Sequence, residues 1–203
     1  MSDVKEQKQA YRDHARDHRD RIDRDETDFE TIIDVFFEYF KPSKDQIIAA
    51  YWPAGKEFDT RFLLDELVKQ GYQCALPVAS KDSRVMQFKK WTHETAMSKG
   101  VWGVPEPQDA EELTPDIVIA PMLAFDQKGY RLGQGGGHYD STLATLREIK
   151  EITYIGIGYA EQAVLFKLPT EGHDIPLDYV MTPKGVTDFK DVRGPRADAY
   201  EGN

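Results

Sequence analysis

Apolar residues along this chain gather in short continuous runs that alternate with segments of helical spacing. The runs cover residues 46–52, 74–77, 117–120, 152–158 and 179–181. A strand that is apolar throughout is typical of a sheet buried on both faces, so each run predicts a buried strand. Residues 85–91 alternate less cleanly between apolar and polar positions and are also predicted to form a strand.

Between these runs, apolar residues recur every three or four positions. This spacing predicts helices over residues 3–26, 28–40, 59–70 and 138–147. Weaker helical patterns are expected at residues 94–99 and 164–168. Asp28 is expected to cap the second helix, because a carboxylate there can accept from the free N–H groups of the first turn.

Strands that alternate with helices indicate an α/β fold. We expect a three-layer sandwich in which a mostly parallel sheet is covered by helices on both faces. Residues 1–183 are expected to form one domain that includes the N-terminal helices, and the polar residues 184–203 a disordered tail. Ligands of such folds bind at the carboxyl ends of the strands.

The densest chemical signal in the chain is a glycine cluster. Gly133 and residues 135–137 are all glycine, with Arg131 just before them and Asp140 just after. Glycine lets the backbone approach a ligand closely, and consecutive free N–H groups form a concave anion site. Arginine adds a planar fork for phosphate oxygens, and a carboxylate can hold Mg²⁺. The arrangement indicates a nucleotide triphosphate site.

This cluster differs from the two commonest glycine motifs. A P-loop requires a lysine that the cluster lacks, and a dinucleotide fingerprint requires a third glycine where His138 stands. The apolar run at residues 117–120 is also too far upstream for that fingerprint. A flexible loop that binds no ligand remains the alternative reading of the glycines alone.

Composition narrows the classes of partner. The chain has 203 residues and a formal net charge of −10, which disfavours general nucleic-acid binding. Any anion site must be built locally from backbone amides, a few basic side chains and a metal ion. No run approaches the ~20 apolar residues of a membrane span, and the polar start lacks a secretory stretch. The single Cys74 lies in an apolar run, so we expect a buried thiol and a cytoplasmic protein.

Five blocks along the chain resemble, in order, those of the 5-formyltetrahydrofolate cyclo-ligase family, also called 5,10-methenyltetrahydrofolate synthetases. Residues 8–12 read Lys-Gln-Ala-Tyr-Arg and resemble the family's Lys-x-x-x-Arg. Tyr-Trp-Pro at residues 51–53 and Gly-Val-Pro-Glu-Pro at residues 103–107 resemble the second and third blocks. Residues 121–140 resemble the central signature and residues 168–178 the last block. The resemblance covers about residues 8–182.

The resemblance implies an ATP-dependent ring closure. The formyl oxygen of 5-formyltetrahydrofolate attacks the γ-phosphate, N10 then attacks the resulting imidate phosphate, and phosphate leaves as 5,10-methenyltetrahydrofolate forms. Phosphoryl transfer depends on positioning and charge neutralisation more than on protein nucleophiles, and the chain has no evident nucleophile pattern. The resemblance also implies Mg²⁺ as cofactor and ATP as co-substrate. We expect a monomer with no nucleic-acid or membrane partner.

The same resemblance assigns residues to roles. Arg131 and Tyr139 are the expected catalytic residues. The expected ATP contacts are Lys8, Arg12, Arg131, Leu132, Gly133, Gln134, Gly135, Gly136, Gly137, His138 and Tyr139. The expected folate contacts are Trp52, Glu57, Gln134, Gly135, Gly136, Gly137 and His138. Asp140 and Asp174 are the expected Mg²⁺ ligands.

Three positions depart from the family's usual signature. Gln134 and His138 stand where tyrosine is frequent, and Ser141 stands where arginine is common. Two other functions therefore remain open. One is a non-catalytic folate- or nucleotide-binding regulator on the same fold, and the other is a different phosphoryl-transfer enzyme.

Overall fold

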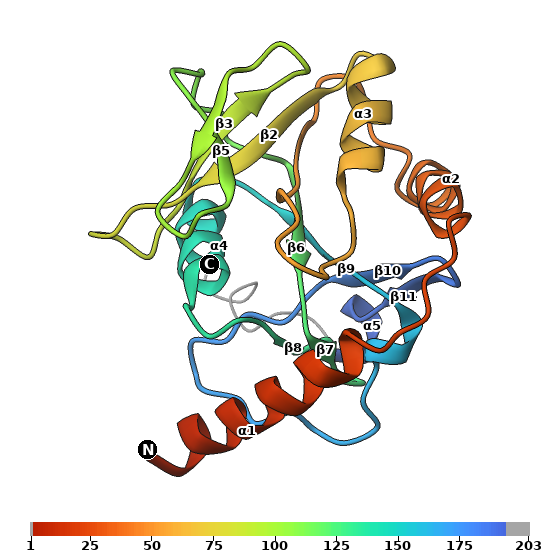
Figure 1. Ribbon diagram of the computed structural model, residues 1–203, viewed down its shortest axis with the longest axis vertical. Helices are drawn as coiled ribbons and strands as arrows, with labels where there is room; N and C mark the ends of the chain where they lie inside the picture. Colours follow the sequence, from red (N-terminus) through yellow and green to blue (C-terminus); the bar gives the residue numbers. More distant parts are fainter. Residues whose placement is uncertain (1, 194–203) are drawn as a thin grey trace, which may run out of the picture.

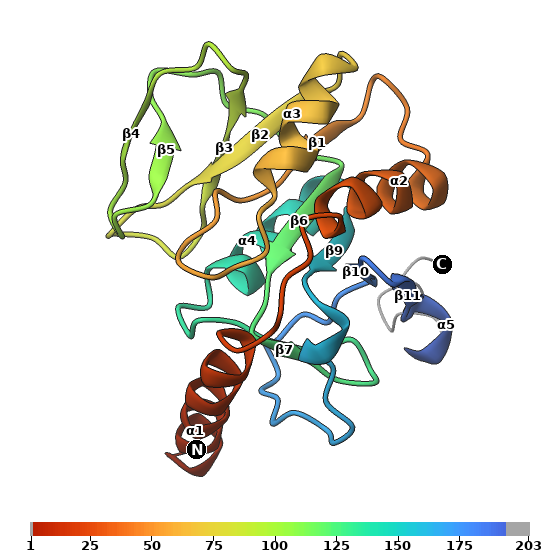
Figure 2. The same ribbon diagram turned by 45° about the vertical axis from the view of Figure 1, so that its right-hand side comes forward.

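The computed structural model describes residues 2–193 (Figures 1 and 2). Within them, seven strands form the main sheet in the order β11-β10-β9-β6-β1-β2-β3. These strands are β1 (Ile47–Ala49), β2 (Gln73–Val78), β3 (Gln87–Trp91), β6 (Ile117–Pro121), β9 (Thr153–Ile157), β10 (Tyr179–Thr182) and β11 (Gly185–Asp188).

The five inner strands are parallel, and the two edge strands are antiparallel. Parallel ladders join β2 to β1, β1 to β6, β6 to β9 and β9 to β10. β3 pairs antiparallel with β2, and β11 pairs antiparallel with β10. The prediction of a mostly parallel sheet is therefore confirmed.

Helices cover both faces of the sheet. The α-helices are α1 (Ser2–Arg19), α2 (Asp28–Phe40), α3 (Arg61–Lys69), α4 (His138–Ile149) and α5 (Lys190–Arg193). In Figure 1, α2 and α3 lie to the right of β6 and α4 lies to its left. Ile32 and Leu63 belong to the core cluster on the first side, and Leu143 to the cluster on the second. The expected three-layer α/β sandwich is confirmed.

The strand order reverses between β1 and β6. From β1 the chain crosses to β2 in one direction, and from β6 it crosses to β9 and β10 in the other. The carboxyl ends of two neighbouring parallel strands diverge at such a point and leave a crevice in which ligands bind. We therefore expect a ligand site formed by the segments that follow Ala49 and Pro121.

Several local predictions agree with the structure, and others are wrong. α2 has the expected bounds, but its cap residue is Thr27, without a side-chain capping bond. The Asp28 carboxylate instead accepts from the Asp25 N–H. α1 ends at Arg19 rather than at residue 26, because residues 22–25 leave the helix.

Two predicted short helices are absent from the described residues. Residues 97–99 form β4 (Met97–Lys99), which pairs with β5 (Pro105–Pro107). This strand pairing overrides the local helical pattern. No helix forms at residues 164–168, and a single 3₁₀ turn, η1 (Ala160–Gln162), precedes them.

The expected tail boundary at residue 184 does not coincide with the end of the sheet. Strand β11 follows it directly, and Phe189 is buried in the α4-side core. The strand was not predicted because residues 185–188 lack the continuous apolar run that marks the inner strands. Residues 194–203 of the expected tail lie outside the described residues. Among residues 2–193, none of the helices combines the length and apolar character that crossing a bilayer requires.

Candidate active site around the glycine loop

A short hairpin after β6 delivers the glycine loop to the crevice. Strands β7 (Ala124–Phe125) and β8 (Arg131–Leu132) pair antiparallel. The turn between them is organised by Asp126, whose Oδ1 accepts from the N–H groups of Lys128 and Tyr130. Asp126 Oδ2 accepts from Leu168 N–H, so this buried carboxylate also anchors the later loop. Arg131 therefore enters the site from a fixed backbone.

The loop itself requires glycine at two positions. Gly135 has φ +101° and Gly137 has φ +70°, which side chains rarely adopt. Gly137 is also the residue before α4, so the free N–H groups of that helix start at the loop. A Cβ at Gly136 would lie 2.5 Å from the His138 ring. The loop thus adopts a backbone conformation that requires glycine at residues 135 and 137, while its use as an anion site stays a prediction.

Arg131 is held inside the protein by two side chains. Its Nε donates to the Tyr154 hydroxyl, and its Nη2 lies 3.1 Å from Asp140 Oδ2. Burial by itself would lower the pKa of Arg131, but Tyr154 and Asp140 outweigh burial and raise it. The guanidinium also lies 5.5 Å from the centroid of the Tyr139 ring. Arg131, Tyr139 and Asp140, which the sequence predicted to act together, are in contact.

The Asp140 carboxylate links two segments. While Oδ2 pairs with Arg131, Oδ1 accepts from Ile175 N–H at 3.0 Å. The neighbouring Asp174 accepts from Glu171 N–H and from Lys8 through Oδ2. Asp140 therefore contacts the residue that directly follows Asp174, the other predicted metal ligand.

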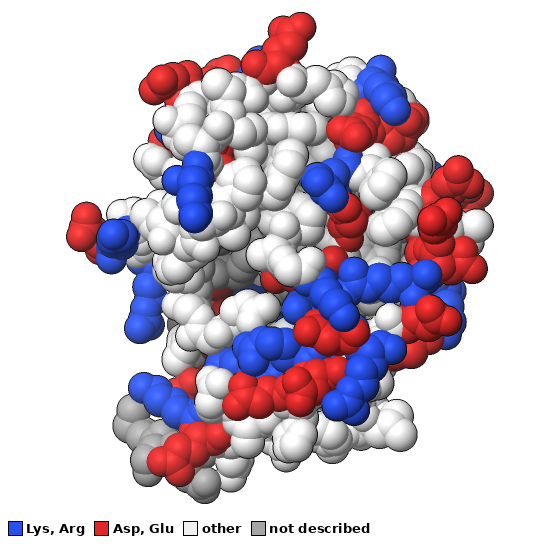
Figure 3. All heavy atoms as spheres, in the orientation of Figure 1, with Lys and Arg blue, Asp and Glu red and all other residues white. Residues whose placement is uncertain are grey.

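Helix α1 covers the outer side of the loop. Lys8 Nζ lies 2.9 Å from Glu171 Oε2 and 2.6 Å from Asp174 Oδ2. Arg12 Nε donates to the Gly133 carbonyl at 3.1 Å, and Arg16 donates to Gln134. Figure 3 shows basic and acidic side chains close together on the lower half of this face, where α1 lies in Figure 1. Basic side chains of α1 therefore lie beside the loop, interleaved with carboxylates.

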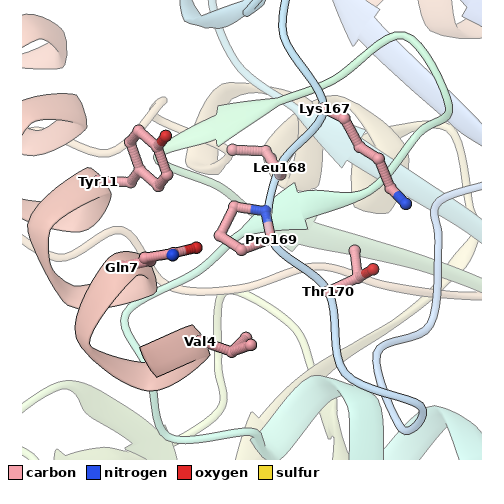
Figure 4. Close-up of a pocket in the computed structure, with 7 residues that line it drawn as sticks. All are labelled: Val4, Gln7, Tyr11, Lys167, Leu168, Pro169 and Thr170. Atoms are coloured by element: carbon pink, nitrogen blue, oxygen red, sulfur yellow. The ribbon is translucent and has the colours of Figure 1, made fainter. Parts of the chain in front are cut away.

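A groove of about 310 Å³ lies beside this contact (Figure 4). It separates Val4, Gln7 and Tyr11 of α1 from residues 167–170. Lys8 and Glu171 follow these lining residues directly in the chain. The groove therefore adjoins the ion pairs that attach α1.

Glu57 follows β1 and is buried. Its Oε2 accepts from Ala54 N–H at 3.0 Å. Burial raises the pKa of Glu57, while the Ala54 N–H, Arg19 and Gln134 partly offset this effect. The interaction with Gln134 brings the segment after β1 to the glycine loop, as expected at the reversal of strand order.

Trp52 and His138 have other neighbours. The Trp52 ring lies 6.1 Å from the Trp91 ring and 5.7 Å from the Arg61 guanidinium, so it packs toward β3 and α3. His138 approaches the Arg84 carbonyl through Nδ1, and its ring lies 4.4 Å from Trp102. Contacts of these two residues with a folate stay predictions.

Two residues of the site were missed by the sequence reasoning. Tyr154 lies in the apolar run of β9, and the sequence does not distinguish it from an ordinary core tyrosine. Arg19 did leave a signal, because positions 8, 12, 16 and 19 share one helix face and all are basic. The charged composition of the first helix concealed this stripe.

Fold and site together define an α/β protein with a glycine loop where the strand order reverses. Comparisons with known proteins identify the family. The sequence model described as "5-formyltetrahydrofolate cyclo-ligase family" matches residues 4–183. A 5-formyltetrahydrofolate cyclo-ligase of Haemophilus influenzae is 35% identical over 136 residues, which are 64% of this chain and 72% of that protein. The Escherichia coli cyclo-ligase is 34% identical over 149 residues, 70% of this chain and 80% of that protein.

A solved structure of a family member has the same fold as this chain. The NMR structure of Aquifex aeolicus 5,10-methenyltetrahydrofolate synthetase superimposes with a TM-score of 0.75 at 26% identity. It covers 96% of this chain and 99% of that one. The chain therefore belongs to the 5-formyltetrahydrofolate cyclo-ligase family, a family of enzymes. The resemblance found in the sequence is confirmed.

Proposed function

We propose that this protein catalyses the ATP-dependent cyclisation of 5-formyltetrahydrofolate to 5,10-methenyltetrahydrofolate, with release of ADP and phosphate. One observation carries the proposal beyond family membership. Arg131 is buried and fixed by Tyr154 and Asp140 at the start of the glycine loop. Its guanidinium lies 5.5 Å from the centroid of the Tyr139 ring, and Tyr139 also interacts electrostatically with the buried Glu57. This contact through Tyr139 supports a site in which Arg131 would bind phosphate and Glu57 would bind the folate.

The glycine loop and α1 would bind ATP. Backbone N–H groups from Gly133 to Gly137 suit phosphate oxygens, and Arg131 would stabilise charge on the transferred phosphoryl group. Leu132, Gln134, His138 and Tyr139 are assigned to the same ligand by their position in this segment. Lys8 and Arg12 would act from α1, where Arg12 donates to the Gly133 carbonyl of the loop and Lys8 pairs with Asp174.

Asp140 and Asp174 would hold Mg²⁺. Their oxygens are the ligands that Mg²⁺ prefers, and the Ile175 N–H bond to Asp140 puts the two residues at one junction. Glu171, His173 and Asp174 also offer ligand atoms within 4.8 Å of one another. The residues present therefore fit the ion, although Lys8 already pairs with two of these carboxylates. A bound Mg²⁺ would neutralise phosphate charge.

The folate would lie on the β1 side of the loop. Glu57 would accept hydrogen bonds from the pterin ring, and Trp52 would line the site. Gln134, Gly135, Gly136, Gly137 and His138 would face both ligands. The formyl oxygen would attack the γ-phosphate and ADP would leave. N10 would then attack the formyl carbon of the imidate phosphate, and the C–O bond would break to release phosphate as N10 loses its proton and the ring closes. Positioning and charge neutralisation supply the catalysis, and no protein nucleophile is needed.

The test is a turnover assay with 5-formyltetrahydrofolate and Mg-ATP, followed by the absorbance of the methenyl product and by ADP release. We expect both products in equal amounts. Folded protein that binds ATP in calorimetry without forming product would contradict the proposal and favour a regulatory binding protein. Turnover of sugar phosphates instead would indicate a different phosphoryl-transfer enzyme. We further propose that the enzyme acts as a monomer in the cytoplasm, which size-exclusion chromatography and cell fractionation test.

A further inference from the structure

Four basic side chains follow one face of α1, and three of them have partners at the site. Lys8 pairs with Asp174, Arg12 donates to the Gly133 carbonyl, and Arg16 donates to Gln134. The fourth is Arg19, the last residue of the helix. Because side chains three and four positions apart are neighbours on a helix, Arg19 continues the stripe that faces the site.

Arg19 is buried with two nitrogens unsatisfied. The residue is 4% exposed, and Nε and Nη1 have no hydrogen-bond partner within the described part of the chain. Its ion pair with Asp20 spans 3.7 Å, beyond a good hydrogen bond. A guanidinium remains charged and offers five donors, and a buried charged donor without an acceptor is costly. Arg19 therefore has donors to offer to a ligand.

The turn that carries Glu57 packs against the end of α1. Lys56 Nζ donates to the Asp20 carbonyl at 2.8 Å, and Arg24 Nη2 donates to the Lys56 carbonyl at 2.6 Å. These bonds hold the turn next to Arg19, whose charge partly offsets the rise that burial causes in the pKa of Glu57. A cationic donor and an anionic acceptor therefore share one corner after β1.

Aromatic side chains surround this corner. Tyr51 is buried and interacts electrostatically with both Glu57 and Arg19. Phe58 follows Glu57 in the chain, and its ring lies 5.1 Å from that of Tyr159. Such surroundings suit a planar ring system.

The charges select the chemistry of the ligand. A phosphate would be repelled by Glu57, so the acceptor for Arg19 is a neutral oxygen. A donor beside a carboxylate, among aromatic rings, complements a heterocycle that carries a carbonyl oxygen next to N–H or amino groups. We propose that Arg19 determines substrate specificity by donating to the ring carbonyl oxygen of a 2-amino-4-oxo pteridine while Glu57 accepts from its amino side. This inference rests on the folate substrate of the proposed function.

The experiment compares two ligands in calorimetry. One is 5-formyltetrahydrofolate, and the other is a folate analogue with a 2,4-diamino ring, in which a donor replaces the carbonyl acceptor. Wild type should prefer the oxo compound. In Arg19→Gln, we expect affinity for the oxo compound to fall about 10- to 100-fold, the loss typical of a charged hydrogen bond. Affinity for the diamino analogue should remain unchanged, so the preference should disappear.

Two further variants keep the result interpretable. Arg21→Gln removes an exposed positive charge two residues away and should leave the preference intact. Arg19→Lys keeps the charge but lacks the planar fork, so it should also lose preference, and it decides the matter if Arg19→Gln does not fold. Equal losses for both ligands, or none, would show that Arg19 only attaches α1. Wild type that binds neither pteridine would refute the folate function itself, and this inference with it.

Discussion

The inner and outer sides of the glycine loop are stabilised in different ways. On the inner side, Arg131 pairs with Asp140 while their side chains are only 7% and 14% exposed. Tyr154 reaches Arg131 from the middle of the sheet. On the outer side, α1 is attached by polar contacts from Lys8, Arg12 and Arg16. The Arg16 side chain is 38% exposed.

The buried contacts of Arg131 hold one geometry, whereas the exposed contacts of α1 can change. Arg131 and Asp140 form a buried ion pair, and removing either partner would leave the other charge uncompensated, which favours one stable arrangement. On the outer side, the Lys8 side chain is only 8% exposed, but that of Arg16 is 38% exposed. Exposed contacts contribute only about 0–1 kcal/mol, so Arg16 can exchange partners readily. On the proposed function, the inner side would position the phosphoryl group, and the exposed contacts of α1 would rearrange when ATP binds.

The largest expected effect comes from the inner side. Arg131→Ala should lower kcat by about 10²–10³-fold, as the loss of a preorganised charged donor does elsewhere. Steady-state kinetics with Mg-ATP measure this change. Arg131→Lys is the matched variant, and it should recover little activity because a compact ammonium lacks the planar set of donors that can reach Tyr154, Asp140 and a phosphate at once. Unchanged kcat/KM in a folded Arg131→Ala variant would remove Arg131 from the phosphate role.

Lys8→Ala tests the outer side. It removes both ion pairs between α1 and Glu171 and Asp174. We expect KM for ATP to rise about 10-fold, since a charged hydrogen bond contributes about 1.5–3 kcal/mol, with a smaller change in kcat. Limited proteolysis should also cut α1 faster. Lys5→Ala, at an exposed position of the same helix, is the control. A fall in kcat alone would contradict the assignment of α1 to binding.

Tyr154→Phe tests whether the sheet positions Arg131. The substitution keeps the ring and removes the hydroxyl that accepts from Arg131 Nε. We expect kcat to fall about 5- to 10-fold, the value of one hydrogen bond of about 1 kcal/mol, while KM for the folate stays constant. Burial raises the pKa of Tyr154 to about 12, so the hydroxyl is neutral near pH 7. A Tyr154→Phe variant with wild-type kcat would show that Asp140 alone is sufficient to position Arg131.

Glu57→Gln should have the smallest of these effects, and the quantity that it changes is the thermal stability of the protein without ligand. Burial raises the pKa of Glu57 in the folded state. A raised pKa favours folding at low pH, and that contribution is lost as the pH rises through the folded value. The Gln variant should therefore melt at a higher temperature than wild type at pH 7. The difference should disappear below the ordinary carboxyl pKa of about 4.3. Thermal scans at both pH values without ligand measure it, and an equal difference at both would contradict the assignment.

Much of the scaffold was predictable because it rests on local patterns. Continuous apolar runs gave the inner strands, and the helical spacing gave α2 with its observed bounds. Predictions failed where pairing partners lie elsewhere in the chain. Residues 97–99 look helical by themselves, yet β5 draws them into a strand. Strand β11 is polar and forms because β10 offers it an unpaired edge.

For the site, the sequence by itself determined the residue types and their order. The glycines at residues 135 and 137 allow the positive φ that the loop adopts there. Lys8 and Arg12 are four positions apart, so both lie on one face of α1. Only the tertiary structure decided which of these residues meet. Tyr154 contacts Arg131 across 23 positions of sequence, and Lys8 contacts Asp174 across 166. Such contacts depend on strand order and packing, for which periodicity carries no information.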